Sequence, residues 1–119
     1  MSDPTILIVD DDEAFASILV DACRMIGHEA VRASGVTTGM AAIETWPGVK
    51  LALVDIQLDR ESGFDFVALA NARLPDLAFI MLSGLGAHAP RPEGYEDVTI
   101  VKKTLSIPDL GALIERVLT

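Results

Sequence analysis

A short apolar run that ends in one carboxylate, residues 51–55 with the sequence LALVD, constrains the fold of this chain more than any other stretch. Turn-forming residues bound it, with Pro47 and Gly48 before it and a polar segment that ends at Gly63 after it. Such a run is typical of a strand buried on both faces of a sheet. Asp55 would then lie at the carboxyl end of that strand, the edge where open α/β sheets carry their sites.

The rest of the chain alternates between similar apolar runs and segments with helical periodicity. Strands are predicted near residues 5–9, 28–33, 51–55, 78–83 and 98–101, and helices near residues 15–26, 36–46, 62–74 and 106–118. Alternating strands and helices predict a parallel sheet with helices on both faces. Right-handed crossovers would bring the carboxyl end of every strand to the same edge.

One interval, residues 84–97, breaks this alternation. Three glycines and two prolines interrupt it: Gly84, Gly86, Pro90, Pro92 and Gly94. Glycine favours non-helical backbone, and proline removes a backbone donor and restricts the residue before it. We expect a loop or at most one helical turn here, and we expect it to be the most mobile part of the fold.

Composition excludes several classes of function. Lys and Arg number 9 against 18 Asp and Glu, a net charge of −9 at pH 7, whereas nucleic-acid-binding domains usually carry a basic surface. No apolar run is long enough to cross a membrane, and the first strand is not preceded by a signal-like segment. We therefore expect one cytoplasmic domain over residues 1–119, with neither a nucleic-acid partner nor a membrane partner.

The predicted sheet edge collects five side chains that suit phosphoryl transfer: Asp10, Asp11, Asp55, Ser83 and Lys103. Carboxylates held close together repel one another unless a proton or a cation neutralises them. Oxygen ligands without a set of His or Cys residues favour Mg²⁺ over zinc. A carboxylate beside Mg²⁺ can attack phosphorus, while a hydroxyl and an ammonium group neutralise the oxygens of the transferred group.

Each of these residues also has an ordinary structural interpretation. Acids such as Asp12 and Glu13 are favoured at a helix N-terminus, and Asp10 and Asp11 could be the same. Asp55 and Ser83 could be turn formers, and Lys103 a solvated surface lysine. The joint placement of the five side chains at four strand ends favours the functional interpretation.

On these residues the chain, from position 5 to position 118, resembles a response-regulator receiver domain, the phosphoacceptor part of two-component signalling. The resemblance rests on residues 6–11 (ILIVDD), 53–55 (LVD) with Gly63 beyond, 82–84 (LSG) and 101–103 (VKK). It implies a flavodoxin-like, doubly wound sheet of five parallel strands in the order 2-1-3-4-5. The broken interval implies that the fourth helix is reduced or absent.

The resemblance assigns a role to each site position. Asp55 corresponds to the phosphoacceptor, and Asp10 and Asp11 to the acidic pair that holds Mg²⁺. The backbone carbonyl of Gln57 corresponds to a further metal ligand. The donor would be a histidine kinase or a phosphotransfer protein, the signal would pass to a further protein partner, and the chain would catalyse only its own phosphorylation and dephosphorylation.

Ser83 matches the switch hydroxyl of the family, and Lys103 matches its lysine. Lys102 is the other candidate for that role. The family has an aromatic residue two positions after the lysine, and counting from Lys103 puts Leu105 at that position, which favours Lys103. The chain departs from the family at Thr104, where a proline usually follows the lysine in a cis peptide. A cis peptide before a residue other than proline is costly, so a trans bond is expected.

Two more departures concern Asp59, where proline is common in the family, and Ile100, where an aromatic switch residue is usual. Ile100 has no hydroxyl, so the coupling of a tyrosine to Ser83 cannot operate in its usual form. Residues 79–85 are also similar to receivers with a PFxFATGY motif, which often stand alone and have an altered fourth helix; Phe79, Ser83 and Gly84 fit that motif.

Three alternatives stay open at this point. A small Mg²⁺-dependent phosphatase of the haloacid-dehalogenase type would use Asp10, with Asp12 as its second acid, but would leave Asp55 unexplained. A flavodoxin-like protein that binds a phosphorylated cofactor would need a first loop rich in Gly, Ser or Thr. A degenerate receiver would act as a scaffold without phosphorylation, and the departures at Thr104 and Ile100 keep that hypothesis open.

Overall fold

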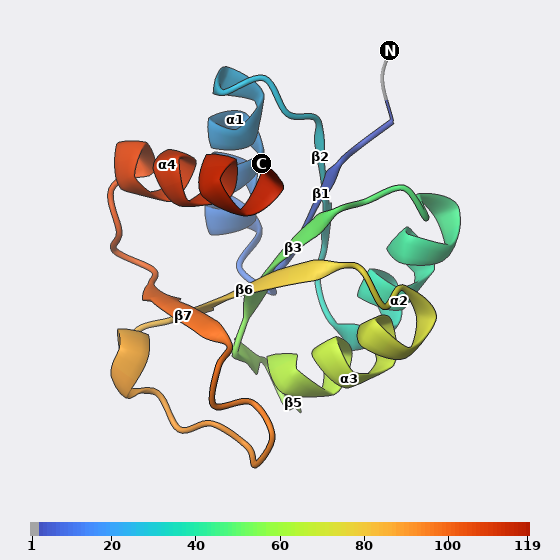
Figure 1. Ribbon diagram of the computed structural model, residues 1–119, viewed down its shortest axis with the longest axis vertical. Helices are drawn as coiled ribbons and strands as arrows, with labels where there is room; N and C mark the ends of the chain where they lie inside the picture. The colour runs from blue at the N-terminus through green and yellow to red at the C-terminus, as the bar shows by residue number, and fades with distance from the viewer. Residues whose placement is uncertain (1–2) are drawn as a thin grey trace.

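Five parallel strands form a central sheet in the computed structural model, which describes residues 3–119 (Figure 1). They are β1 (Ile6–Val9), β2 (Ala30–Ala33), β3 (Leu51–Asp55), β6 (Ala78–Ser83) and β7 (Thr99–Lys102), paired in the order β2-β1-β3-β6-β7. Counted along the chain, these five strands have the predicted order 2-1-3-4-5. β1 and β3 lie in the middle of the sheet and are fully buried, which explains their unbroken apolar sequences.

Four helices cover the two faces of the sheet. α1 (Glu13–Met25) and α4 (Ile107–Leu118) lie on one face, and α2 (Val36–Thr45) and α3 (Gly63–Arg73) on the other (Figure 1). Alternate residues of β1 serve the two layers, since Ile6 and Ile8 pack in one hydrophobic cluster and Leu7 and Val9 in the other. The three central strands β1, β3 and β6 are therefore more deeply covered than the edge strands β2 and β7.

A short hairpin, with two residues in each strand, follows β3 and was not predicted from the sequence. β4 (Gln57–Leu58) pairs antiparallel with β5 (Glu61–Ser62). The turn between them holds Asp59 at φ +52°, a left-handed conformation that aspartate tolerates and that proline cannot adopt. The departure from proline at Asp59 is therefore compatible with this hairpin, whereas a proline would not be.

The interval at residues 84–97 contains a single 3₁₀ turn, η1 (Gly86–His88), so the predicted loss of the fourth helix is confirmed. The loop is nevertheless anchored. The ring of Tyr95 packs against Phe64 of α3 with centroids 5.2 Å apart, and Ala89 is buried. The guanidinium of Arg91 donates to the backbone carbonyls of residues 95, 96 and 98. The expected mobility of this loop remains a prediction.

No helix among residues 3–119 has both the length and the apolar character that a membrane span requires.

Candidate functional site

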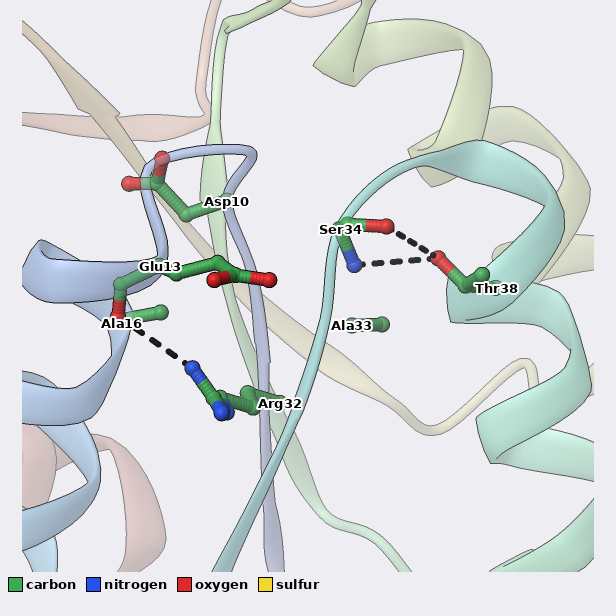
Figure 2. A pocket seen from close by; sticks show the side chains of 7 residues that line it. All are labelled: Asp10, Glu13, Ala16, Arg32, Ala33, Ser34 and Thr38. Carbon is green, nitrogen blue, oxygen red and sulfur yellow. Dashed lines mark hydrogen bonds between the residues drawn. The ribbon is translucent and has the colours of Figure 1, made fainter.

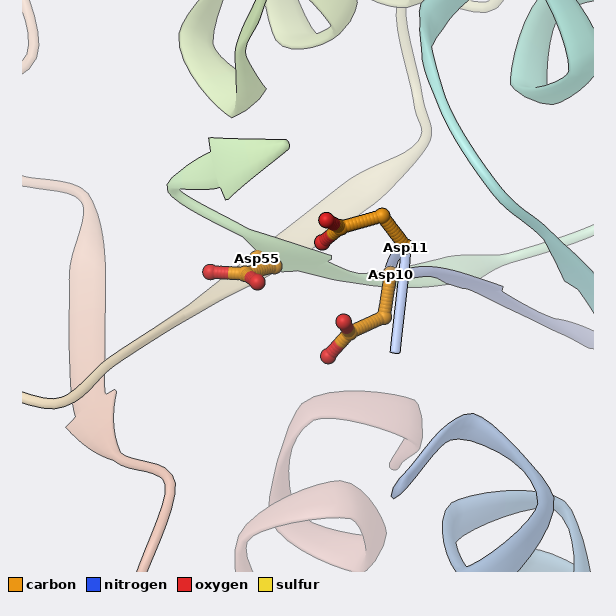
Figure 3. Close-up of side chains that lie close together, drawn as sticks. All are labelled: Asp10, Asp11 and Asp55. Atoms are coloured by element: carbon orange, nitrogen blue, oxygen red, sulfur yellow. The ribbon is translucent and has the colours of Figure 1, made fainter. Parts of the chain in front are cut away.

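Three carboxylates converge beyond the carboxyl ends of β1 and β3. Asp10, Asp11 and Asp55 each present an oxygen, and these oxygens lie within 4.8 Å of one another (Figure 3). Asp10 and Asp55 are buried, with exposed fractions of 2% and 5%, whereas Asp11 is exposed. The parallel pairing of Val9 with Val54 ends both strands at the same level, so the sheet itself brings the carboxylates together.

Lys103 brings the only cation that contacts this cluster within the described chain. Its Nζ lies 2.8 Å from Oδ2 of Asp55 and 3.0 Å from Oδ2 of Asp10. The first contact is a hydrogen bond, and the second is an ion pair at a similar distance. One ammonium group therefore contacts two of the three carboxylates, those of Asp10 and Asp55.

The backbone around Lys103 is fixed despite the missing proline. Residues 3–119 contain no cis peptide, so the bond between Lys103 and Thr104 is trans, as expected. The amide of Lys103 donates to the carbonyl of Ser83, and Leu105 closes a turn onto Lys102. The side chain of Lys102 points elsewhere, with its stem against Gly86 of η1. The structure thus places Lys103 at the cluster and Lys102 outside it.

Backbone amides hold the second oxygen of each buried carboxylate. Oδ1 of Asp10 accepts a bond from the amide of Asp12 at 2.9 Å, and Oδ1 of Asp55 accepts one from Gln57 at 3.0 Å. Gly63 lets the start of α3 approach this loop closely, because a Cβ there would lie 2.1 Å from the carbonyl oxygen of Asp55. The acids are consequently held in place by the chain that follows each strand.

The pKa values reflect this crowding. Burial raises the pKa of Asp55, and the nearby charge of Asp10 adds to the rise, while the bonds from Lys103 and Gln57 oppose it. Burial alone would lower the pKa of Lys103, but its hydrogen bonds and attraction to Asp55 and Asp10 outweigh burial and raise it. Lys103 stays charged at neutral pH, and its single positive charge does not balance the negative charges of the clustered carboxylates.

Ser83 and Gln57 complete the set of predicted site residues. Ser83 is the last residue of β6 and is buried, and its hydroxyl oxygen accepts a bond from the amide of Leu85 at the start of the 84–97 loop. Its proton is left to be donated elsewhere. Gln57 directs its side-chain amide to the carbonyl of Asp59, away from the carboxylates, so that only its backbone is available to a ligand at Asp55.

The donor set fits Mg²⁺ better than a transition metal. All of the converging ligand atoms are carboxylate oxygens. The buried Oδ2 of Asp10 has the ammonium group of Lys103 beside it, but that group also serves Asp55, so one positive charge is divided between two buried acids. Asp10, Asp11 and Asp55 would hold the ion, and the carbonyl of Gln57 remains the fourth ligand that the family resemblance implies.

A pocket of about 240 Å³ adjoins the cluster on the side of α1 and β2 (Figure 2). It is lined by Asp10, Glu13, Ala16, Arg32, Ala33, Ser34 and Thr38. Arg32 donates to the carbonyl of Glu13, and both the amide and the hydroxyl of Ser34 bond with the hydroxyl of Thr38. The rest of the polar lining consists of the carboxylates of Asp10 and Glu13, so the pocket continues the acidic edge.

Sequence reasoning missed one contact at the site, that of Phe15. The ring centroid of Phe15 lies 4.9 Å from Nζ of Lys103, within the range of a cation–π interaction. The helical periodicity had marked Phe15 only as part of an apolar stripe, and no local pattern could have linked it to Lys103. Asp12 caps α1 by accepting a bond from the amide of Phe15, as its interpretation as a helix-start acid predicted.

Comparison with known proteins gives a consistent result. Residues 6–115 match the family described as response regulator receiver domain. The photosynthetic apparatus regulatory protein RegA of Rhodovulum sulfidophilum is 37% identical over 87 residues, which are 73% of this chain and 47% of RegA. The acid tolerance regulatory protein ActR of Rhizobium meliloti is 37% identical over 84 residues, 71% of this chain and 43% of ActR. The chain spans about half of the length of these relatives.

Solved structures show the same architecture. The CheY-like receiver domain protein of Methanospirillum hungatei superposes with a TM-score of 0.82 at 27% identity, over 97% of this chain and 93% of that protein. The receiver domain of PhyR from Erythrobacter litoralis superposes with a TM-score of 0.80 at 26% identity, over 99% of this chain and 92% of that domain.

Proposed function

The chain belongs to the response regulator receiver domain family, and on that premise we propose that residues 1–119 are one domain that accepts a phosphoryl group on Asp55. The donor is a histidine kinase or a phosphotransfer protein in the cytoplasm, and the reaction requires Mg²⁺, which receiver domains generally bind. The domain catalyses only its own phosphorylation and dephosphorylation. Its output is a conformational shift that a protein partner reads.

The surroundings of Asp55 carry the proposal. Its carboxylate is buried at the end of β3, among two further carboxylates and next to the ammonium group of Lys103. A carboxylate oxygen of Asp55 attacks phosphorus, the O–P bond forms as the bond from phosphorus to the donor imidazole nitrogen breaks, and the imidazole takes up a proton. Lys103 and the hydroxyl of Ser83 donate to oxygens of the transferred group. Water later attacks phosphorus, which releases inorganic phosphate and restores the carboxylate.

A bound Mg²⁺ would neutralise charge that Lys103 alone cannot balance, both on the carboxylates and on the incoming phosphoryl oxygens. Asp11 is the exposed member of the cluster and is the natural direct ligand. Asp10 would serve the ion and Lys103 together, because its Oδ2 lies beside Nζ at the edge of the cluster.

The phosphatase alternative gains no support from the geometry. Its second acid, Asp12, is exposed and its carboxylate is engaged in capping α1. Asp10 and Asp55 are both buried and similarly held, each with one oxygen on a backbone amide and the other beside Lys103, so the engagement of Asp12 is what weighs against this alternative. The scaffold alternative rested partly on Thr104, yet the trans peptide there still lets Lys103 reach Asp55.

We propose a protein, not a nucleic acid, as the output partner of this domain. A domain with a net charge of −9 is repelled by phosphate backbones. The DNA-binding transcriptional regulator NtrC of Azospirillum brasilense is 27% identical to this chain, which aligns to only 25% of its length.

Incubation with acetyl phosphate and Mg²⁺, followed by borohydride reduction and mass spectrometry, tests the proposal. Asp55 should carry the label, and Asp55→Asn should abolish it because an amide is a far weaker nucleophile than a carboxylate. Asp59→Asn, a matched change at the exposed aspartate of the β4–β5 turn, should leave labelling intact. Label on Asp10 would instead favour the phosphatase.

A further inference from the structure

A closed circuit of contacts starts and ends at Asp10. Oδ1 of Asp10 accepts the amide of Asp12, and Oδ1 of Asp12 accepts the amide of Phe15 at 3.1 Å. The ring of Phe15 lies 4.9 Å from Nζ of Lys103, and Nζ returns to Oδ2 of Asp10 at 3.0 Å and to Asp55 at 2.8 Å. No part of this circuit beyond its acids and its lysine enters the proposed reaction.

Lys103 needs such support more than a lysine before proline would. Its side chain has four rotatable bonds and its trans peptide leads into Thr104, which is exposed. The backbone bond to Ser83 fixes the main chain but leaves the side chain free to turn. Only 26% of the Lys103 side chain is exposed, and the ring of Phe15 supplies part of its cover.

An aromatic face suits this task because it attracts the ammonium group through its π electrons and is not a strong hydrogen-bond acceptor like a carboxylate. The three N–H donors of Lys103 then stay available for Asp10, Asp55 and a phosphoryl oxygen. The position of the ring is itself set, since Phe15 lies in the first turn of α1 and Asp12 fixes where that turn begins.

We infer that Phe15 is a positioning residue for Lys103: its ring holds the ammonium group against Asp10 and Asp55, and the cap by Asp12 holds the ring. The inference extends the proposed phosphorylation of Asp55 and rests on it for its kinetic consequence. The contact itself exists in the unphosphorylated protein and can be measured there.

The kinetic test measures the rate of phosphorylation by acetyl phosphate and Mg²⁺, a donor too small to use the outer surface of α1. Phe15→Leu keeps apolar bulk but removes the π face, and should slow the reaction about two- to fivefold, the range of a partly exposed cation–π contact. Phe15→Tyr keeps the π face and should retain the wild-type rate. Ile18→Ala, at an exposed position of the same helix, is the matched control and should have no effect.

The second test is NMR of the Lys103 ammonium group in the protein without Mg²⁺ or phosphodonor. Its ¹H–¹⁵N signal should be visible in the wild type and in Phe15→Tyr, and should broaden through solvent exchange in Phe15→Leu. Asp12→Ala should have the same effect as Phe15→Leu, and Asp12→Asn, which keeps a capping oxygen without the charge, should not.

A Phe15→Leu protein that keeps both the wild-type rate and the wild-type ammonium signal would overturn the inference and reduce Phe15 to a packing residue. A protein in which wild-type Asp55 takes no phosphoryl group would overturn the proposed function instead, while the ammonium signal would still decide the role of Phe15.

Discussion

At the scale of single residues, the site is a problem of charge balance. Two of the three clustered carboxylates, Asp10 and Asp55, share one ammonium group, and burial raises the pKa of Asp55 even though Lys103 donates to it. A second cation is the direct remedy, and each acid differs in what it can offer that cation. Asp10 is committed to a backbone amide and to Lys103, whereas Asp11 is exposed.

We predict that Asp11→Ala weakens Mg²⁺ binding by at least about tenfold, or about 1.4 kcal/mol, because it removes a direct ligand. Isothermal titration calorimetry measures the affinity directly. Asp21→Ala removes the same charge at an exposed position of α1 and should change the affinity little. Equal affinities in the wild type and Asp11→Ala would remove Asp11 from the metal site.

The two neighbouring lysines offer a second comparison at this scale. Lys103→Ala should reduce the rate of phosphorylation by acetyl phosphate roughly tenfold to a hundredfold, since it removes the ammonium group that lies 2.8 Å from Asp55. Lys102→Ala should have a small effect, because Lys102 packs against Gly86 and points away from the carboxylates. Reversed effects would mean that the lysine register is off by one residue.

At the scale of elements, the 84–97 loop is where this chain differs most from an alternation of strands and helices. It begins directly after Ser83, whose hydroxyl already accepts a bond from Leu85. Recruitment of that hydroxyl by a phosphoryl oxygen would therefore act first on this loop. Ile100 is buried in the core, and it has no aromatic ring that could move when the Ser83 hydroxyl moves. We therefore expect the loop and α4, not a pair of helices, to form the surface that changes.

Arg91 is the residue that we expect to hold this loop in place. Its guanidinium donates to three backbone carbonyls, so Arg91→Ala should leave those carbonyls without their donor and lower the free energy of unfolding by roughly 1 kcal/mol. Hydrogen exchange should accelerate at residues 91–98 and stay unchanged in β1 and β3. Arg60→Ala, a loss of the same charge in the exposed β4–β5 turn, is the control. Uniform acceleration over the whole chain would contradict a local role.

At the scale of the whole molecule, stability should depend on the same charges. The folded protein raises the pKa of Asp55 and of Lys103, so in each case it binds a proton more readily than the unfolded chain does. For Asp55 this contribution is present at acid pH and is lost as pH rises through the folded pKa; for Lys103 it is lost only at strongly alkaline pH. At neutral pH without a divalent cation, ionised Asp55 therefore costs stability.

It follows that Asp55→Asn, which removes that charge, should melt a few degrees above the wild type at neutral pH without Mg²⁺, and that the difference should shrink near pH 4. At a concentration 100 times Kd, Mg²⁺ should raise the free energy of unfolding of the wild type by about 2.7 kcal/mol and so raise its melting temperature. The melting temperature of Asp55→Asn should rise less. Differential scanning calorimetry over this pH range gives both comparisons. A mutant that melts below the wild type at neutral pH would show that the ion pair with Lys103 outweighs the burial of Asp55.

The sequence alone determined the elements and the edge at which the site forms. Hydrophobic period, turn residues and caps are local properties, and right-handed crossovers then place Asp10, Asp55, Ser83 and Lys103 at one edge of the sheet. The order of the strands, which makes those ends neighbours, came from the resemblance to receiver domains. The loss of the fourth helix was equally local, because it follows from glycine and proline.

Tertiary structure alone decided which atoms meet. The convergence of Asp10 with Asp55 and the contact of Lys103 with Asp55, 48 residues away along the chain, depend on backbone positions that no short-range pattern encodes. The ring of Phe15 beside Lys103 is the clearest case, since it joins the first helix to the end of the last strand. Contacts between residues distant in sequence are set by the packing of whole layers, and a periodicity read along one segment carries no information about its partner across the fold.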